Sequence, residues 1–254
     1  MAFAMVRGNR LAYEDHGAGR PLVFLHGWGT SGRVWDAQAV DLVADHRVIT
    51  LDLRGCGRSD RPATGYTIAE VTRDVLEFLD GVGVERPVLI GSSIAGSFLV
   101  EAALAAPDRL GGIVPVDAGV HHFVGRHKEI DQLLAALRAD RAGTLADFVP
   151  RWYRPDAATA LIDRTVRQIL DAGCLIDGLL VDQAGYDPRP RLGGITVPTH
   201  FLHGELDTEV PLSIPQECVE LIPGARMTVV EGAGHMAQQD RADLFTRALR
   251  DALR

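Results

Sequence analysis

The sequence predicts an α/β fold in which a largely parallel β-sheet is covered by α-helices. Short apolar runs, typical of buried strands, alternate along the chain with longer segments of helical periodicity, as in successive βαβ units. The chain has 254 residues, of which 46% are hydrophobic. A single domain of this size can bury a substantial core, so we expect one domain rather than several.

Six apolar runs are predicted as strands, because strands that are buried on both faces read as short hydrophobic segments. They are residues 21–25, 47–51, 87–90, 113–116, 197–202 and 227–230. Three segments between and after them are predicted as helices, namely residues 68–79, 98–106 and 240–253. In the first helix, Val71, Val75 and Leu79 recur at the spacing of one helix face, and the second helix stops at Pro107.

Residues 120–191 interrupt the alternation of strands and helices. Helical periodicity recurs at residues 130–137 and 161–170, but no run in this region predicts a strand. We therefore expect residues 1–119 and 192–254 to form the core, with residues 120–191 inserted in the same domain as a helical cap, or lid.

Composition excludes several classes of function. The formal net charge is -8 and the basic residues are scattered, whereas nucleic-acid binding needs a concentrated basic face. The three cysteines share no metal-ligand spacing and suit a reducing compartment. The chain shows no signal peptide and no apolar run long enough to cross a membrane, so a cytoplasmic protein is expected.

The strongest chemical signal is the segment Gly91-Ser92-Ser93-Ile94-Ala95-Gly96, which follows a predicted strand and opens a helical pattern. In this context a G-x-S-x-G-like motif places a serine on a tight strand-to-helix turn, where the small residues Gly91 and Ala95 let the chain pass closely. The helix that follows would point its free N–H groups at an oxyanion formed there. Ser93 is thus a candidate nucleophile; the alternative is a glycine-rich turn with an ordinary serine.

Two further segments follow predicted strands: His26-Gly27-Trp28-Gly29 and Asp52-Leu53-Arg54-Gly55-Cys56-Gly57-Arg58-Ser59-Asp60. With the serine motif, they closely resemble the α/β-hydrolase superfamily, and within it the cofactor-free esterases, lactonases and perhydrolases. The resemblance covers the chain outside residues 120–191. It implies a mostly parallel twisted sheet with helices on both faces and no metal or organic cofactor. It also implies a helical cap inserted after the sixth strand, as the strands of that fold are counted.

The resemblance also suggests roles for residues in these loops. In this fold the loop after the first HG sequence donates a second backbone N–H to the oxyanion, so the oxyanion hole is assigned to the N–H groups of Trp28 and Ile94. The neighbouring His26 is interpreted as a brace for the loop. Asp52 and Arg54 are interpreted in the same way, as structural residues that hold a tight loop beneath the site.

The resemblance supplies an acid and a base as well. Asp207, in the segment His203–Pro211, matches the family's G-x-x-D loop and is the expected acid; Asp117, at the end of a strand, is the alternative. His235, in the glycine-rich segment Glu231–Met236, is the expected base. The chain order of serine, acid and histidine is then the one that the fold requires.

The predicted cap contains the residues that would choose the substrate. Its aromatic and aliphatic side chains either line an apolar pocket or pack between cap helices; the candidates for the pocket are Phe123, Phe148, Trp152, Tyr153 and Leu179, with Ile176 and Leu180 beside them. Three histidines also cluster where the cap begins, namely His121, His122 and His127. Without carboxylates at ligand spacing, they are interpreted as surface or pocket-wall residues rather than a metal site.

These residues predict a serine hydrolase that cleaves a small carboxylic ester or lactone. Ser93 would attack the carbonyl while His235 takes its proton, and Asp207 would fix the histidine tautomer, so that the reaction passes through an acyl-enzyme. Three alternatives remain open: a hydrolase of carbon–carbon bonds in β-diketone-like compounds, a perhydrolase, and a ligand-binding or signalling protein of the same fold with slow turnover.

Overall fold

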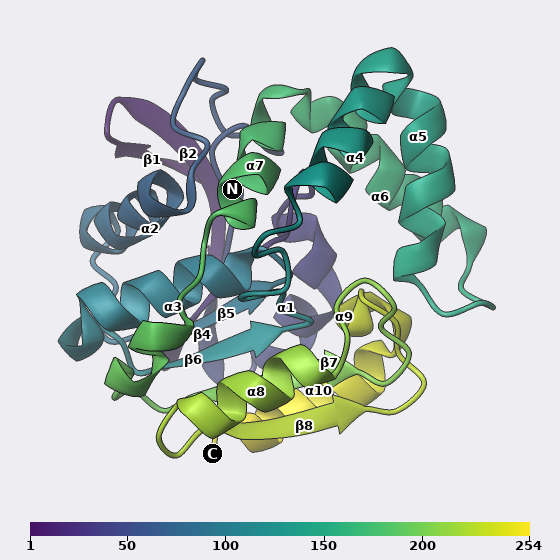
Figure 1. Ribbon diagram of the computed structural model, residues 1–254. Coiled ribbons are helices and arrows are strands. Elements are labelled where there is room, and N and C mark those ends of the chain that lie inside the picture. Colours follow the sequence, from purple (N-terminus) through teal and green to yellow (C-terminus); the bar gives the residue numbers. More distant parts are fainter.

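The computed structural model describes residues 1–254 and is built on one eight-stranded sheet with the order β1-β2-β4-β3-β5-β6-β7-β8 (Figure 1). The strands are β1 (Ala2–Val6), β2 (Asn9–His16), β3 (Arg20–Leu25), β4 (His46–Leu51), β5 (Val88–Ser92), β6 (Gly112–Val116), β7 (His200–Gly204) and β8 (Arg226–Val230). Strands β3 to β8 are mutually parallel. Strand β2 pairs antiparallel with β4 on one side and with β1 on the other. The predicted α/β fold with a mostly parallel sheet is confirmed.

All six expected strands form, but the sequence analysis missed β1 and β2. In this antiparallel hairpin only two residues of each strand are buried and the rest are exposed or partly exposed, so polar and apolar residues mix and no apolar run marks either strand. The strand expected at residues 197–202 begins only at His200, because Pro198 has no N–H for the sheet. The Pro198 carbonyl still accepts a hydrogen bond of 2.9 Å from the N–H of Ile113.

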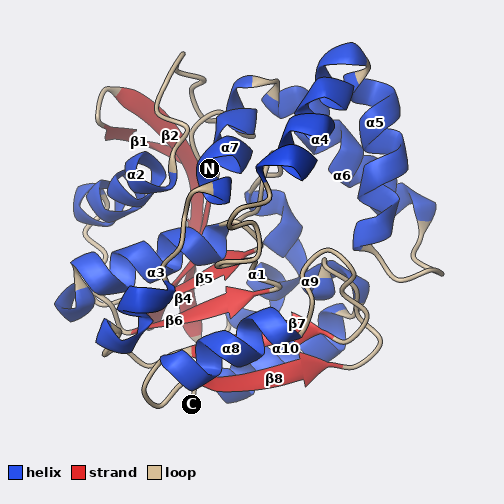
Figure 2. Ribbon diagram, viewed as in Figure 1, coloured by secondary structure: helices blue, strands red, loops and turns tan.

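Helices cover both faces of the sheet (Figure 2). α1 (Asp36–Leu42) and α10 (Ala242–Ala252) pack together on one face, and α2 (Ile68–Gly81), α3 (Ala95–Ala105) and α8 (Ser213–Leu221) cover the other. The helix expected at residues 240–253 is divided into α9 (Ala237–Asp240) and α10. The 3-10 helices are η1 (Gly32–Trp35), η2 (Pro107–Arg109), η3 (Val149–Trp152), η4 (Leu175–Asp177) and η5 (Arg189–Gly194).

Four helices lie between β6 and β7: α4 (His127–Ala139), α5 (Arg141–Phe148), α6 (Thr159–Ala172) and α7 (Gly178–Ala184). They sit above the carboxyl ends of the central strands (Figure 1), and residues of α4, α5 and α7 share a cavity with the loops that follow β3 and β5. The carboxyl ends of parallel strands are where ligands bind in open α/β sheets. None of the helices combines the length and apolarity that are needed to cross a membrane.

The loop after β4 is braced by two buried side chains. Asp52 accepts hydrogen bonds from the N–H groups of Gly32 (2.8 Å) and Arg58 (3.0 Å). The guanidinium of Arg54 donates a bond of 2.7 Å to Asp74 on α2, and both side chains are almost fully buried. These contacts hold the D-x-R-G-x-G segment against the loop after β3 and against α2.

Replacing Asp74 with alanine should lower the free energy of unfolding by about 3–5 kcal/mol, because it leaves the buried Arg54 charge without its partner. Urea denaturation measures this value. The control is Asp80→Ala on the same helix, which breaks only an exposed ion pair with Arg109 and should cost less than about 1 kcal/mol. Equal losses from the two variants would show that the Arg54–Asp74 pair does not brace the loop.

Candidate active site

Ser93 lies at a strained turn between β5 and α3. Its φ is +57°, a left-handed value that costs a non-glycine residue on the order of 1–3 kcal/mol. Two backbone hydrogen bonds hold it, from the Ser93 N–H to the Val116 carbonyl (2.8 Å) and from the Gly96 N–H to the Ser93 carbonyl (3.0 Å). A Cβ at Gly91 would lie only 3.0 Å from the Cβ of Ala95, so the turn needs glycine at residue 91.

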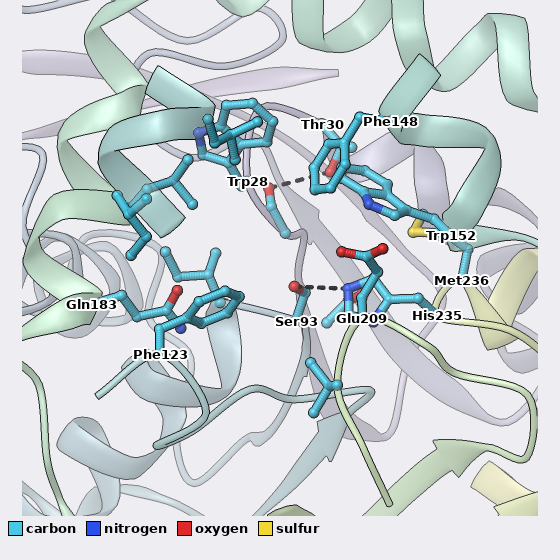
Figure 3. Close-up of a pocket in the computed structure, with 17 residues that line it drawn as sticks. Trp28, Thr30, Ser93, Phe123, Phe148, Trp152, Gln183, Glu209, His235 and Met236 are labelled. Atoms are coloured by element: carbon cyan, nitrogen blue, oxygen red, sulfur yellow. Dashed lines mark hydrogen bonds between the residues drawn. The ribbon is translucent and has the colours of Figure 1, made fainter. Parts of the chain in front are cut away.

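The Ser93 hydroxyl begins a series of two hydrogen bonds. Ser93 Oγ lies 3.0 Å from His235 Nε2, and His235 Nδ1 lies 2.8 Å from Asp207 Oδ2 (Figure 3 shows the Ser93–His235 contact). The other Asp207 oxygen accepts the N–H groups of Glu209 (2.8 Å) and Val210 (2.9 Å), which fixes the carboxylate. The three side chains come from the loops that follow β5, β8 and β7, so the parallel sheet brings them to one edge.

Charge and burial oppose each other in this series. Burial of the His235 ring disfavours its charged form, but the Asp207 carboxylate outweighs that effect and raises the pKa of His235 from 6.5 to about 9. Burial also opposes the ionisation of Asp207, yet the His235 ring holds the pKa of this carboxyl below its usual 3.8. The pair therefore stabilises an imidazolium, the form that appears when His235 accepts a proton.

Asp117, the alternative acid, faces other groups. Its oxygens accept the N–H of Gly204 (2.7 Å) and the N–H of Ala237 (3.1 Å), and it makes no hydrogen bond to His235. Burial, together with the nearby Asp207 charge, raises the pKa of Asp117 well above its usual 3.8. Asp117 thus joins the end of β7 to the start of α9, whereas Asp207 contacts the histidine.

One group of side chains has ligand atoms close enough to share a metal ion. It consists of Asp117, His203 and Asp207, whose atoms lie within 4.8 Å of one another. Most of their atoms already have protein partners: both carboxylates accept the bonds described above, and His203 Nε2 donates to the Val210 carbonyl (2.9 Å), which leaves only His203 Nδ1 without a hydrogen bond. The geometry of this cluster therefore fits loop bracing better than coordination of a metal.

The N–H groups of Trp28 and Ile94 both lie at residues that line a cavity above Ser93, and neither donates to any acceptor in the protein. Free backbone donors on two sides of a serine are the requirement for an oxyanion hole. A Cβ at Gly27 would lie 3.2 Å from the Cβ of Ser93, so the close approach of this loop needs glycine.

His26 makes its contacts within the loops rather than with Ser93. The ring is fully buried; Nδ1 donates to the Gly27 carbonyl (2.8 Å), and Nε2 accepts the Leu53 N–H (3.0 Å). Burial lowers the pKa of His26, so the ring is neutral and serves as both donor and acceptor. It links the loop after β3 to the loop after β4.

The cavity above Ser93 and His235 is lined by residues of α4, α5 and α7 and by the loops at the carboxyl ends of the strands, as the close-up shows for the labelled side chains (Figure 3). Ten of the 17 residues in its wall are hydrophobic, which favours an apolar acyl group. The structure places Phe123, Phe148 and Trp152 in this wall, together with Leu180. The sequence analysis did not single out Thr30, Ile130, Leu133, Gln183, Glu209 and Met236, which also line it.

Two expected pocket residues, Tyr153 and Leu179, lie outside this wall, as does Ile176. The Tyr153 hydroxyl is held by Thr165 and Gln239, at 2.6 Å from each, so the ring packs between the helices and the end of the core. Leu179 is buried in the hydrophobic core. On a short helix the face toward a cavity depends on the packing of its neighbours, and hydrophobicity alone does not identify it.

The three histidines at 121, 122 and 127 line no part of the cavity and belong to no metal-ligand group. His121 Nε2 lies 2.9 Å from a carboxylate oxygen of Glu217, and His127 is exposed. His122 accepts a hydrogen bond of 2.6 Å from Arg126, and burial together with that charge lowers its pKa to about 4. These histidines serve local packing and surface contacts.

Comparisons of the sequence and of the structure with known proteins point to the same family. The profile of the alpha/beta hydrolase fold family matches residues 20–242. A protein of Azorhizobium caulinodans, provisionally named carbamate hydrolase RutD, is 32% identical over 247 residues, which cover 94% of this chain and 93% of that protein. An esterase from Exiguobacterium antarcticum superposes with a TM-score of 0.91 at 27% identity, with 98% of this chain and 97% of that chain covered.

An enol-lactonase from Burkholderia xenovorans superposes with a TM-score of 0.87 at 28% identity, with 99% of both chains covered. The family match spans most of the chain, and it agrees with the sheet order and with the serine turn at the end of β5. The chain therefore belongs to the alpha/beta hydrolase fold family and is a hydrolase.

Proposed function

We propose that the protein cleaves a carboxylic ester or lactone through an acyl-enzyme, with Ser93 as nucleophile, His235 as base and Asp207 as the acid that orients the base. The observation that carries the proposal is the hydrogen-bonded series Ser93–His235–Asp207 at the base of an apolar cavity. The resemblance to an esterase and an enol-lactonase supports this substrate class.

The reaction follows from these contacts. Ser93 Oγ attacks the carbonyl carbon as its proton passes to His235 Nε2, because a neutral alcohol is a weak nucleophile. The oxyanion accepts hydrogen bonds from the N–H groups of Trp28 and Ile94, each worth about 3–4 kcal/mol to the transition state. The bond to the leaving alcohol then breaks as His235 returns the proton. Water, deprotonated by His235, attacks the acyl group and releases the acid and Ser93.

In this proposal residues 120–191 act as the cap, and residues 1–119 and 192–254 form the catalytic core. Three of the helices between β6 and β7 line the cavity: α4 supplies Ile130 and Leu133, α5 supplies Phe148 and α7 supplies Leu180. The acyl group would lie against these side chains while its carbonyl meets Ser93. A cap in this position shields the acyl-enzyme from bulk water and selects the substrate by shape.

Release of nitrophenolate from p-nitrophenyl acetate, butyrate and octanoate tests the proposed activity. We expect turnover of butyrate with a kcat/KM roughly tenfold above that of acetate, since two more methylenes enter an apolar cavity. Octanoate then measures how far the cavity extends. Stabilisation of the protein by these esters without any product would instead support a binding protein with this fold.

The pH dependence of kcat/KM tests the role of His235. Only the neutral ring can accept the Ser93 proton, so activity falls as the pH drops below the His235 pKa. Because Asp207 raises that pKa above 6.5, the acid limb of the profile should have its midpoint above pH 6.5. Rates of p-nitrophenyl butyrate hydrolysis from about pH 5 to about pH 10 give the midpoint. A midpoint at or below the ordinary histidine value would contradict the assignment of Asp207 as partner.

A further inference from the structure

The apolar cavity contains one carboxylate that has no partner. Glu209, in the loop after β7, lines the wall beside His235, and its side chain forms neither an ion pair nor a hydrogen bond in the protein (Figure 3). Only its backbone N–H is bonded, to Asp207 Oδ1 (2.8 Å), which fixes the residue on the catalytic loop. After burial, His235 and Asp207 act most strongly on its charge; Arg151 and Arg126 act more weakly, and neither arginine lines the cavity.

A second polar group lies in the same wall. Gln183 of α7 is 2% exposed, and its Nε2 has no acceptor in the protein. Figure 3 shows Gln183 and Glu209 on different sides of Ser93. A fully buried amide such as that of Gln183 is normally paired, because a polar group without a partner is unfavourable in apolar surroundings, and the Glu209 carboxylate is partly buried in the same wall. An acceptor and a donor therefore face a cavity whose other walls are largely apolar.

We infer that Glu209 determines specificity, and that the substrate is an ester or lactone carrying a hydrogen-bond donor, either an ammonium or a hydroxyl group, close to the reacting carbonyl. The donor group binds the Glu209 carboxylate, and Gln183 Nε2 donates to an oxygen of the same substrate. A substrate that carries a free carboxylate is rejected, because its charge would lie beside the like charge of Glu209 in a largely apolar cavity. This inference rests on the proposed function.

Three ethyl esters of similar shape test the charge preference: ethyl pentanoate, ethyl γ-aminobutyrate and monoethyl succinate. The substitution Glu209→Gln keeps the shape of the side chain and removes its charge. At about pH 8 it should lower the kcat/KM ratio of the aminobutyrate to the pentanoate about tenfold, and raise the ratio of the succinate to the pentanoate by a similar factor. Ratios are used because an effect of Glu209 on the His235 pKa changes all three rates equally.

A second pair of esters separates the two kinds of donor. Ethyl β-hydroxybutyrate and ethyl isovalerate differ by a hydroxyl in place of a methyl group. If the natural donor is a hydroxyl, the parent should prefer the hydroxy ester and Glu209→Gln should remove that preference. If it is an ammonium, the ratio of the hydroxy ester to the isovalerate should be the same in Glu209→Gln as in the parent, while the aminobutyrate and succinate ratios change as described.

The control is Glu231→Gln, which removes the same charge from an exposed residue near His235 but outside the cavity, and which should leave all ratios as in the parent. Unchanged ratios in Glu209→Gln would overturn the inference. Calorimetric binding of the same esters to Ser93→Ala and to Ser93→Ala/Glu209→Gln separates the two claims. A charge preference in binding, without turnover by the parent, would retain the role of Glu209 and refute the esterase proposal; no preference in binding or in turnover would refute the role of Glu209.

Discussion

Replacing Ser93 with alanine should lower kcat for p-nitrophenyl butyrate by about 10⁴-fold to 10⁶-fold, the range found when the nucleophile of a serine hydrolase is removed. The alanine variant keeps the cavity and the free N–H groups of Trp28 and Ile94, but it has no atom that can form the acyl-enzyme. The KM should change little by comparison, because the wall of the cavity is intact. Steady-state kinetics with purified protein gives both values.

The matched control is Ser97→Ala. Ser97 is a fully buried serine one helical turn beyond Ser93 on α3; its hydroxyl has no partner in the protein and lies outside the cavity wall. Removing this hydroxyl should leave kcat within a few-fold of the parent value. If Ser93→Ala stayed within tenfold of the parent, Ser93 would not be the nucleophile.

Replacing Asp207 with asparagine should lower kcat by about 10⁴-fold, the second largest effect expected. Asparagine preserves the size of the side chain, but its amide can present the wrong partner to His235 Nδ1 and turn the ring to the tautomer that cannot accept the Ser93 proton. The loss of charge also removes the main force that raises the pKa of His235. The effect should therefore appear mainly in kcat rather than in KM.

Asp117→Asn is the comparison that separates the two candidate acids. An asparagine can still accept one of the N–H groups from Gly204 and Ala237, so the substitution should cost about 1–3 kcal/mol of stability, with a kcat within roughly tenfold of the parent. Thermal unfolding and kinetics of the two variants are measured side by side. A larger loss of kcat in Asp117→Asn than in Asp207→Asn would transfer the role of the acid to Asp117.

Much of the fold could be predicted because its signals are local. Parallel strands such as β3 and β5 are buried on both faces and stand out as apolar runs, and α2 shows its face by periodicity. The hairpin of β1 and β2 was missed because few of its residues are buried, and they form neither an apolar run nor a regular alternation in β2. The start of β7 was placed too early. The apolar run begins before Pro198, but regular strand pairing begins only after this proline, at His200.

The candidate site could likewise be predicted only in part from the sequence. The sequence analysis selected Ser93, Asp207 and His235 from short motifs that follow strands, and the structure brings them within hydrogen-bond distance of one another. Glu209 lies in the segment that contains the acid, but neither it nor Gln183 is a motif residue, because their importance depends on which side chains remain unpaired after the helices pack. That property belongs to the tertiary structure, and no pattern in the sequence reveals it.

The most direct test of the account is to find which atom of the protein becomes acylated or phosphonylated. The protein is incubated with a fluorophosphonate that mimics the tetrahedral intermediate, and the adduct is located by mass spectrometry of the intact chain and of its peptides. We expect one adduct per chain, on Ser93 and not on the adjacent Ser92, with esterase activity lost in proportion. An adduct at another residue, or full activity in a chain modified at Ser93, would contradict it.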